Sequence, residues 1–224
     1  MKKTLLITTL ILFITSNVYS QSRVPDSSLY RNDESQLMYY IKTDKLFTGL
    51  AYNTPPYGPD EKWEMTYRKG LPNGKFRFWD KDNLEHKEME GRFKGRDTYH
   101  YRDIPVGKWT YWYEDGQKKR TGKYKGLDEN GRYMHDGKWI DWHENGQKWS
   151  ESNYKDGKLD GLYTSWHENG HKRQEVIFKD GKRNGLATKW YDNGKKMAEG
   201  TFKDGELISE QCWDEAGNET EECN

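Results

Sequence analysis

The chain repeats itself with a period of about 24 residues, and this period limits what it can fold into. A period of this length is typical of arrays in which each unit packs only on its neighbours. About seven units fit between Gly49 and the C-terminus, with extra segments between units near Gly95–Val106 and Gly126–Asp136. Three residue columns keep the period: Trp142, Trp166, Trp190 and Trp213; Gly146, Gly170, Gly194 and Gly217; and Tyr154, Phe178 and Phe202.

One unit, from Gly161 to Asn184, has the features of a β-hairpin. Its alternating run Leu162–Trp166 is rich in aromatic and β-branched residues, which favour strands. Asn169 and Gly170 predict a two-residue type I′ turn, in which both central residues need positive φ. A second turn of the form Lys-Asp-Gly-Lys leads into the next unit. We therefore predict tandem hairpins.

The turn fixes a register. Opposed residue numbers sum to 339, so Gly161 faces Phe178 and Trp166 faces Arg173. An aromatic side chain across from a glycine covers the gap that the glycine leaves. The Trp column and the Tyr/Phe column then lie on opposite faces of one sheet. We expect these columns to form the packing spine of the array, which consists of Trp79, Trp112, Trp142, Trp166, Trp190, Trp213, Tyr124, Tyr154, Phe178 and Phe202.

The apolar composition favours a thin fold. Aromatic residues make up 15% of the chain and all hydrophobic residues only 32%, so aliphatic side chains are scarce. Such a chain cannot build a wide core packed with leucine, and it must bury aromatic area in an elongated arrangement. The predicted fold is all-β, an elongated single-sheet β-meander of tandem hairpin repeats of about 24 residues.

Residues 1–20 predict a secretory signal peptide. Lys2 and Lys3 precede the apolar run Leu5–Ile14, and Val18 and Ser20 are the small residues of a cleavage site. The apolar run is too short to span a bilayer. We therefore expect export to the periplasm, the outer surface or the medium.

The charge balance argues against nucleic acid as a partner. Lys and Arg number 37 and Asp and Glu number 37, which gives a formal net charge of zero. A nucleic-acid binder would show a strong basic excess.

The units resemble MORN repeats, and more closely the bacterial variant of that family. The motif pieces are Trp142-His143-Glu144-Asn145-Gly146-Gln147-Lys148 and Tyr154-Lys155-Asp156-Gly157-Lys158, with copies in the next two units. The resemblance covers residues 45–218, between a lead-in segment (21–44) and an acidic tail (219–224). It implies an all-β meander without enzymatic activity. Many such bacterial proteins carry the label of a YwqK-family toxin–antitoxin antitoxin.

The sequence holds no catalytic motif and no cofactor fingerprint. His143 and His167 occupy equivalent repeat positions, with His171 nearby, but a metal site needs three or four converging ligands. Tyr113 and Tyr191 hold the same repeat position as these histidines, which we interpret as a solvated strand face. We expect no catalytic residues, no metal and no cofactor.

The leading functional hypothesis is an exported, non-enzymatic repeat scaffold that binds a protein or an envelope component along its extended sheet. The alternative is a carbohydrate- or phospholipid-binding module, because Trp and Tyr rings suit both sugars and membrane interfaces. Peripheral membrane or glycan contact therefore stays open.

Cys212 and Cys223 are the only cysteines, and an exported chain would pair them. A turn at Gly217-Asn218 would place the two side chains opposite each other, because opposed residue numbers would sum to 435. A turn at Ala216-Gly217, as in the other units, would make them a diagonal pair, which is harder to bridge.

Overall fold

The computed structural model describes residues 22–25, 29–31, 38–40, 48–53, 62–79, 85–97, 102–221 and 223. The expected signal peptide and most of the lead-in segment lie outside these residues. All regular secondary structure in the described part is strand, as the sequence predicts.

The strands follow one another along the chain with short connections. They are β1 (Ser22–Pro25), β2 (Leu29–Arg31), β3 (Met38–Tyr40), β4 (Gly49–Asn53), β5 (Lys62–Arg68), β6 (Leu71–Trp79), β7 (Lys87–Asp97), β8 (Arg102–Pro105), β9 (Gly107–Trp112), β10 (Lys118–Leu127), β11 (Tyr133–Trp142), β12 (Lys148–Lys155), β13 (Lys158–Leu159), β14 (Gly161–Trp166), β15 (Lys172–Lys179), β16 (Lys182–Trp190), β17 (Lys196–Lys203), β18 (Glu206–Trp213) and β19 (Glu219–Thr220).

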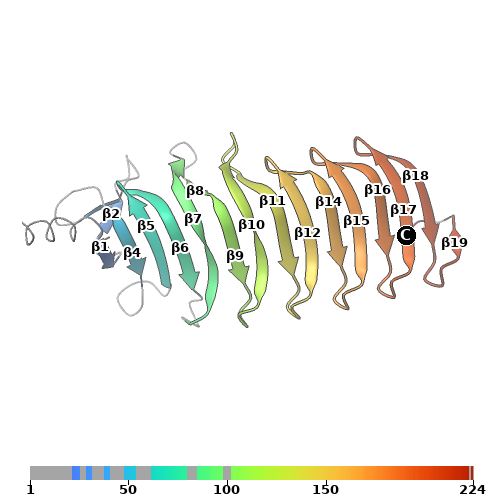
Figure 1. Cartoon of the computed structure of the whole chain (residues 1–224), viewed down its shortest axis with the longest axis horizontal. Coiled ribbons are helices and arrows are strands. Elements are labelled where there is room, and N and C mark those ends of the chain that lie inside the picture. The colour runs from blue at the N-terminus through green and yellow to red at the C-terminus, as the bar shows by residue number, and fades with distance from the viewer. Residues whose placement is uncertain are drawn as a thin grey trace, which may run out of the picture.

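Seventeen of these strands form one sheet, which runs the length of the molecule (Figure 1). From β4 onward the strands pair antiparallel in chain order, except that β8 and β9 both pair with β7, and β13 and β14 both pair with β12. β1 pairs parallel with β4. β2 and β3 form a separate two-stranded sheet. The predicted elongated meander in a single sheet is confirmed. Its repeating hairpins in the described chain are β4–β5, β6–β7, β9–β10, β11–β12, β14–β15, β16–β17 and β18–β19.

Two kinds of turn alternate along the array, and the type I′ turns are not where the sequence predicted them. The loop at Asn169-Gly170 has three residues, because His167 N–H donates to His171 O over 2.9 Å and Gly170 N–H donates to His167 O over 2.9 Å. Only Gly170 has positive φ there, at 85°. In three-residue hairpin loops a left-handed glycine ends the turn in this way.

The Lys-Asp-Gly-Lys turns between units are the two-residue turns. Asp180 and Gly181 both have positive φ, at 50° and 85°, and Lys179 pairs with Lys182 across them. Two consecutive residues with positive φ are what a type I′ turn requires. The corresponding turns at Asp156-Gly157 and Asp204-Gly205 have the same signs of φ.

Asn169 contributes to the loop through the hydrogen bonds of its side chain and not through a positive φ. Its Oδ1 accepts from His171 N–H over 3.0 Å, and its Nδ2 donates to the Asp192 carbonyl of the next unit over 2.8 Å. Asn145 and Asn193 make the same two kinds of hydrogen bond. The asparagine therefore closes its own loop and joins it to the next one.

The loop length changes the register near the turn. Gly161 lies opposite Phe178, as predicted, and the sum of 339 holds as far as Ser165 and Gln174. Trp166, however, pairs with Lys172 instead of Arg173, because Arg173 is an extra, bulged residue. Each of the strand pairs β6–β7, β11–β12 and β16–β17 has the same irregularity.

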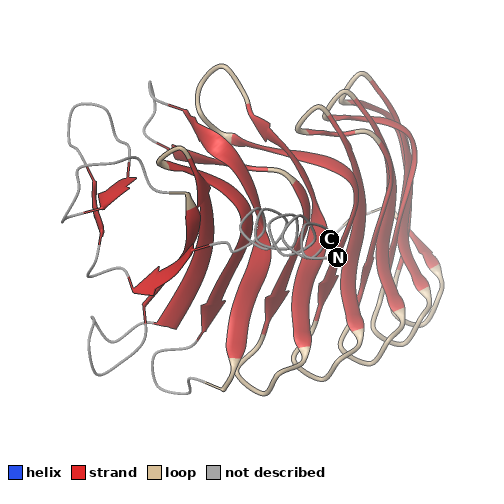
Figure 2. Cartoon of the chain, turned by 60° about the vertical axis from the view of Figure 1, so that its left-hand side comes forward, coloured by secondary structure: helices blue, strands red, loops and turns tan. Residues whose placement is uncertain are grey.

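The two faces of the sheet carry different side chains. Trp166, Lys172 and Thr164 lie on one face, which we call the ladder face; Tyr163 and Val176 lie on the other, which we call the core face. The Trp column and the Tyr/Phe column are on opposite faces, as the register predicted. Figure 2 shows that the strands bow along their length, so the sheet is curved rather than flat.

The tightest packing is on the core face, and two of its members were not in the predicted spine. Trp109, Tyr124 and Trp139 are buried together, at 4%, 8% and 2% exposure. The Trp139 ring lies over Gly122, where a Cβ atom would overlap the ring, and Trp109 lies over Gly91 in the same way. Each glycine therefore makes room for the tryptophan of the following hairpin.

The two extra segments lengthen hairpins and do not interrupt the array. The first contains β8, which pairs with β7, and Arg96 forms an ion pair with Asp103 there. The second lengthens β10 and β11, and Asp128 closes its loop by accepting from Asn130 and Arg132 N–H groups. Insertions at such positions leave the units before and after them in register.

Replacing Gly122 by alanine should destabilise the array by about 3 kcal/mol, at the upper end of the usual cost of overpacking. Gly122 does not have a positive φ, so the cost comes from the Trp139 ring and not from backbone strain. Urea unfolding of Gly122→Ala would measure it. In the background of Trp139→Leu the same change should cost much less; equal costs in both backgrounds would refute the contact.

Asn169 offers a test of the hydrogen bonds that join successive loops. Asn169→Ala removes both hydrogen bonds and should cost about 1–2 kcal/mol, since a net hydrogen bond contributes about 0.5–1.5 kcal/mol. Asn169→Asp keeps the Oδ1 acceptor but cannot donate to Asp192 O, so its cost should be smaller. Urea unfolding and amide exchange at His171 would separate the two effects. An Asn169→Asp variant as stable as the wild type would show that the bond to the next unit contributes nothing.

Candidate functional site

The predicted Trp column lies on the ladder face, and it is half-buried rather than a closed core. A lysine from one hairpin lies over the tryptophan of the next, with Nζ 4.5–5.7 Å from the ring centroid. Such cation–π contacts contribute about 0.5–1 kcal/mol each at exposed positions. The pairs are Lys62–Trp79, Lys87–Trp112, Lys148–Trp166, Lys172–Trp190 and Lys196–Trp213.

The residue after each of these tryptophans joins one unit to the next. Tyr113 donates its hydroxyl hydrogen to the Trp142 carbonyl over 2.6 Å, and Tyr191 donates to the Trp213 carbonyl over 2.9 Å. His143 and His167 reach the carbonyls of Trp166 and Trp190 through Nε2, over 3.2 and 3.0 Å. The interpretation of this position as a solvated face is wrong, because its side chains are half-buried hydrogen-bond donors.

These hydrogen bonds define the role of the histidines. A carbonyl oxygen can only accept, so Nε2 of His143 and of His167 carries a proton. His171 makes a similar contact through Nδ1, 2.6 Å from the Asp192 carbonyl. Tyrosine can replace histidine at this position because both side chains extend a donor toward the neighbouring strand.

The Tyr/Phe column lies on the core face. Tyr124 is buried, while Tyr154, Phe178 and Phe202 are half-buried. Tyr124 and Tyr154 contact the His135 ring, with centroid distances of 5.0 and 4.9 Å. At its N-terminal end the column joins the buried cluster through Tyr124, and toward the C-terminal end its side chains are only half-buried.

A cavity of about 910 Å³ opens on the core face where the hairpins β6–β7, β9–β10 and β11–β12 meet. Pockets of about 300–1,000 Å³ are typical of small-molecule and side-chain binding sites. Aromatic residues that line it are Tyr111, Tyr113, Tyr124 and Trp149, together with Trp112 and Trp142 of the Trp column, whose side chains belong to the ladder face. The repeat pattern does not predict this site, because several of its residues, among them Asp141 and Trp149, vary between units.

The floor of the cavity holds an ion pair. Arg120 Nε donates to Asp141 Oδ1, and Ser150 Oγ donates to Asp141 Oδ2 over 2.9 Å. Asp141 is 6% exposed, so both carboxylate oxygens have partners where water is largely excluded. The Tyr111 and Tyr124 hydroxyl groups lie 3.4 Å apart beside it. Burial, and then the hydrogen bond to Tyr124, raises the pKa of Tyr111, so this tyrosine stays neutral at physiological pH.

Most charges around the cavity are negative. Glu88, Glu114, Asp115, Asp141 and Glu144 line it, against Lys119 and Arg120. His86 also lines it and is only 9% exposed, and its Nε2 has no hydrogen-bond partner within the described residues. A buried polar nitrogen without a partner is costly, so a group that could bond to it would be favoured.

Trp149 is the sequence signal that could have marked the site. It is the bulged residue of its hairpin, and Lys119, Arg173 and Met197 hold the corresponding place in other units. At 43% exposure it is one of two large aromatic residues among the exposed hydrophobic side chains of the described chain, with Tyr133 at 47%. A bulge can redirect a side chain toward a site in this way.

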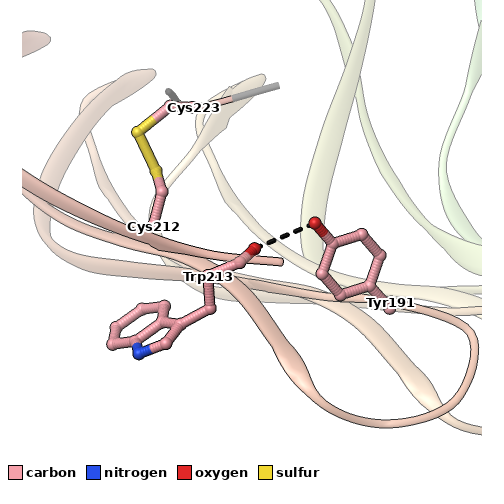
Figure 3. The surroundings of a disulfide bond; sticks show 4 residues. All are labelled: Tyr191, Cys212, Trp213 and Cys223. Carbon is pink, nitrogen blue, oxygen red and sulfur yellow. Dashed lines mark hydrogen bonds between the residues drawn. A yellow bond between two sulfur atoms is a disulfide. The ribbon is translucent and has the colours of Figure 1, made fainter. Parts of the chain in front are cut away.

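Cys212 and Cys223 form a disulfide bond, with their Cα atoms 5.4 Å apart (Figure 3). Cys212 pairs with Thr220 across the last hairpin, and Asp214 N–H donates to Asn218 O over 2.9 Å, so this loop matches those of the other units. The alternative turn at Gly217-Asn218 is therefore wrong. Cys223 reaches Cys212 from beyond the end of β19, a third arrangement besides the opposed and diagonal pairs.

The last hairpin extends further than the sequence suggested. Glu219 and Thr220 form β19, so the expected acidic tail begins with a strand of the sheet. Figure 3 shows Cys212 and Trp213 pointing to opposite sides of β18. Among the described residues Glu210, Cys212 and Cys223 form the group of potential metal ligands, but the two sulfur atoms are bonded to each other.

His135 should make the stability of the array depend on pH. Burial, and then the nearby Arg120, lowers the pKa of His135 below its ordinary value of 6.5. The unfolded chain therefore binds a proton before the folded chain does, and the free energy of unfolding should fall as the pH drops below about 6.5. Urea unfolding at several pH values should show a smaller loss for His135→Phe than for the wild type. Identical pH dependence would contradict this, and His171→Phe serves as an exposed control.

The comparisons with known proteins agree with this geometry. Four segments match the family model described as MORN repeat variant, at residues 105–125, 136–156, 159–180 and 183–204. No curated protein matches the chain. Each matched segment corresponds to one hairpin or to a hairpin and the turn that follows it. Four tandem segments between residues 105 and 204 are therefore similar to MORN repeat variants.

Proposed function

We propose that the protein is an exported, non-enzymatic scaffold that binds a protein or envelope partner along its extended sheet. The observation that carries this proposal is the single-layered sheet of seventeen strands, whose core face opens into a cavity lined by aromatic and charged side chains. A long, open sheet offers a large contact area relative to chain length. Repeat arrays commonly use such surfaces for binding.

Two features support export. The N-terminal sequence has the pattern of a signal peptide, and the disulfide bond between Cys212 and Cys223 suits an oxidising compartment. No helix among the described residues is long and apolar enough to cross a membrane. Sequencing the N-terminus of the protein recovered from its own cell envelope or medium should give Gln21 as the first residue.

The alternative, a carbohydrate- or phospholipid-binding module, is less well supported on the Trp column. Lysine side chains already lie over one face of Trp79, Trp112, Trp166, Trp190 and Trp213. Trp149 is the exposed ring that lines the cavity, so glycan contact there stays a test outcome rather than a second proposal.

The scaffold proposal predicts how truncated arrays behave. Removing one whole unit, residues 161–184, should preserve the fold and the capture of a partner, because the flanking hairpins keep their register. Removing twelve residues should misalign the turns and abolish both. Each variant and the wild type would be used to capture proteins from envelope extract, with mass spectrometry as the readout. Loss of folding in both deletions, or no partner for the wild type, would contradict the proposal.

A further inference from the structure

The charged residues that line the cavity on the core face are mostly acidic. Arg120 and Asp141 neutralise each other through their ion pair. The remaining charged residues are Glu88, Glu114, Asp115 and Glu144 against Lys119. Lys119 lies over the Tyr113 ring, 5.3 Å from its centroid, and is the only free ammonium group lining the described cavity. This excess of carboxylates attracts a cation and repels an anion.

The aromatic side chains of the cavity also favour a cation as ligand. Trp149 is 43% exposed and lines the cavity, so part of its surface can receive a ligand. Aromatic faces attract ammonium and guanidinium groups, and the attraction grows when the site excludes water. The ladder face of the same sheet already uses this interaction, for example between Lys172 and Trp190.

The buried end of the cavity lacks one hydrogen bond. His86 is 9% exposed, and its Nε2 has no partner in the described structure. When Nδ1 carries the proton, Nε2 of an imidazole is an acceptor, and an ammonium or guanidinium N–H would satisfy it. The cavity therefore offers an exposed aromatic ring and an excess of carboxylates, and His86 lies beside it with a buried nitrogen that has no partner within the described residues.

We propose that this cavity binds an arginine or lysine side chain of a partner protein. The proposal rests on the scaffold function and names the chemistry of the partner. The cation would lie against Trp149 with the carboxylates of Glu144 and Glu88 around it. A cavity of about 910 Å³ has room for such a side chain with its neighbouring peptide groups.

The repeats supply matched controls for a direct test. Glu168 holds in the next unit the position of Glu144, and Arg173 holds that of Trp149, and neither lines the cavity. The probe is a capped pentapeptide with two arginines separated by glycines. A peptide of equal length with citrulline in place of arginine removes the charge and keeps the size, with a carbonyl oxygen in place of one guanidinium nitrogen. Titration calorimetry measures the affinity of each.

Trp149→Ala and Glu144→Gln should each weaken binding of the arginine peptide about five- to tenfold. Glu168→Gln and Arg173→Ala should leave it unchanged within about twofold. Raising the salt concentration should weaken binding to the wild type more than binding to Glu144→Gln. Salt screens the attraction between the carboxylates and the peptide, and the variant has one carboxylate fewer. All four positions are exposed, so the variants should fold, which circular dichroism would check.

Three results would overturn the proposal. The citrulline peptide could bind as well as the arginine peptide, the control variants could weaken binding equally, or a neutral oligosaccharide could bind in the cavity when the arginine peptide does not. Capture from envelope extract separates this from the scaffold function. A partner retained by the wild type and by Trp149→Ala alike would place the contact elsewhere on the sheet and leave the scaffold function standing.

Discussion

The structure depends on the lateral contact between one hairpin and the next, because most of the array has no second layer to pack on. Every unit must bury apolar area against its neighbours within the sheet. On the core face Trp139 lies over Gly122, and on the ladder face Lys148 lies over Trp166. Backbone pairing supplies the connection, and these side chains determine how closely adjacent hairpins approach.

Polar side chains also join neighbouring hairpins, at the ends of the strands. Asn169 joins its loop to the next one through Asp192 O, and His167 does so through Trp190 O. In the unit that carries Asp115 in place of asparagine, Gln117 Nε2 donates to Glu144 O over 3.1 Å instead. A carboxylate cannot donate, so a neighbouring amide takes over the bond. Different residues can therefore make the hydrogen bond from one loop to the next, so the sequence can change at these positions without loss of the bond.

The cavity arises where this regularity is weakest. It lies among the units next to the two extra segments, where Trp149 replaces the glutamate, lysine, arginine or methionine of other bulge positions. Arg120, which is exposed, forms an ion pair there with the buried Asp141, and removing Arg120 would be costly because the Asp141 carboxylate would stay buried without it. Repeat positions that maintain packing can vary little, so a distinct site arises where the units differ.

The sequence by itself determined the period, the hairpins, the single sheet and the opposite placement of the two aromatic columns, because these follow from local turn signals and from alternation along a strand. It could not determine that Asn169 closes a three-residue loop, because an Asn-Gly pair suits two-residue and three-residue loops alike and the hydrogen bonds that close this loop are seen only in the structure. Nor could it separate the buried Trp109 and Trp139 from the half-buried Trp166, because all three lie in similar alternating runs. Only the tertiary structure decided these points, since burial and the cavity depend on which side chains of neighbouring hairpins meet.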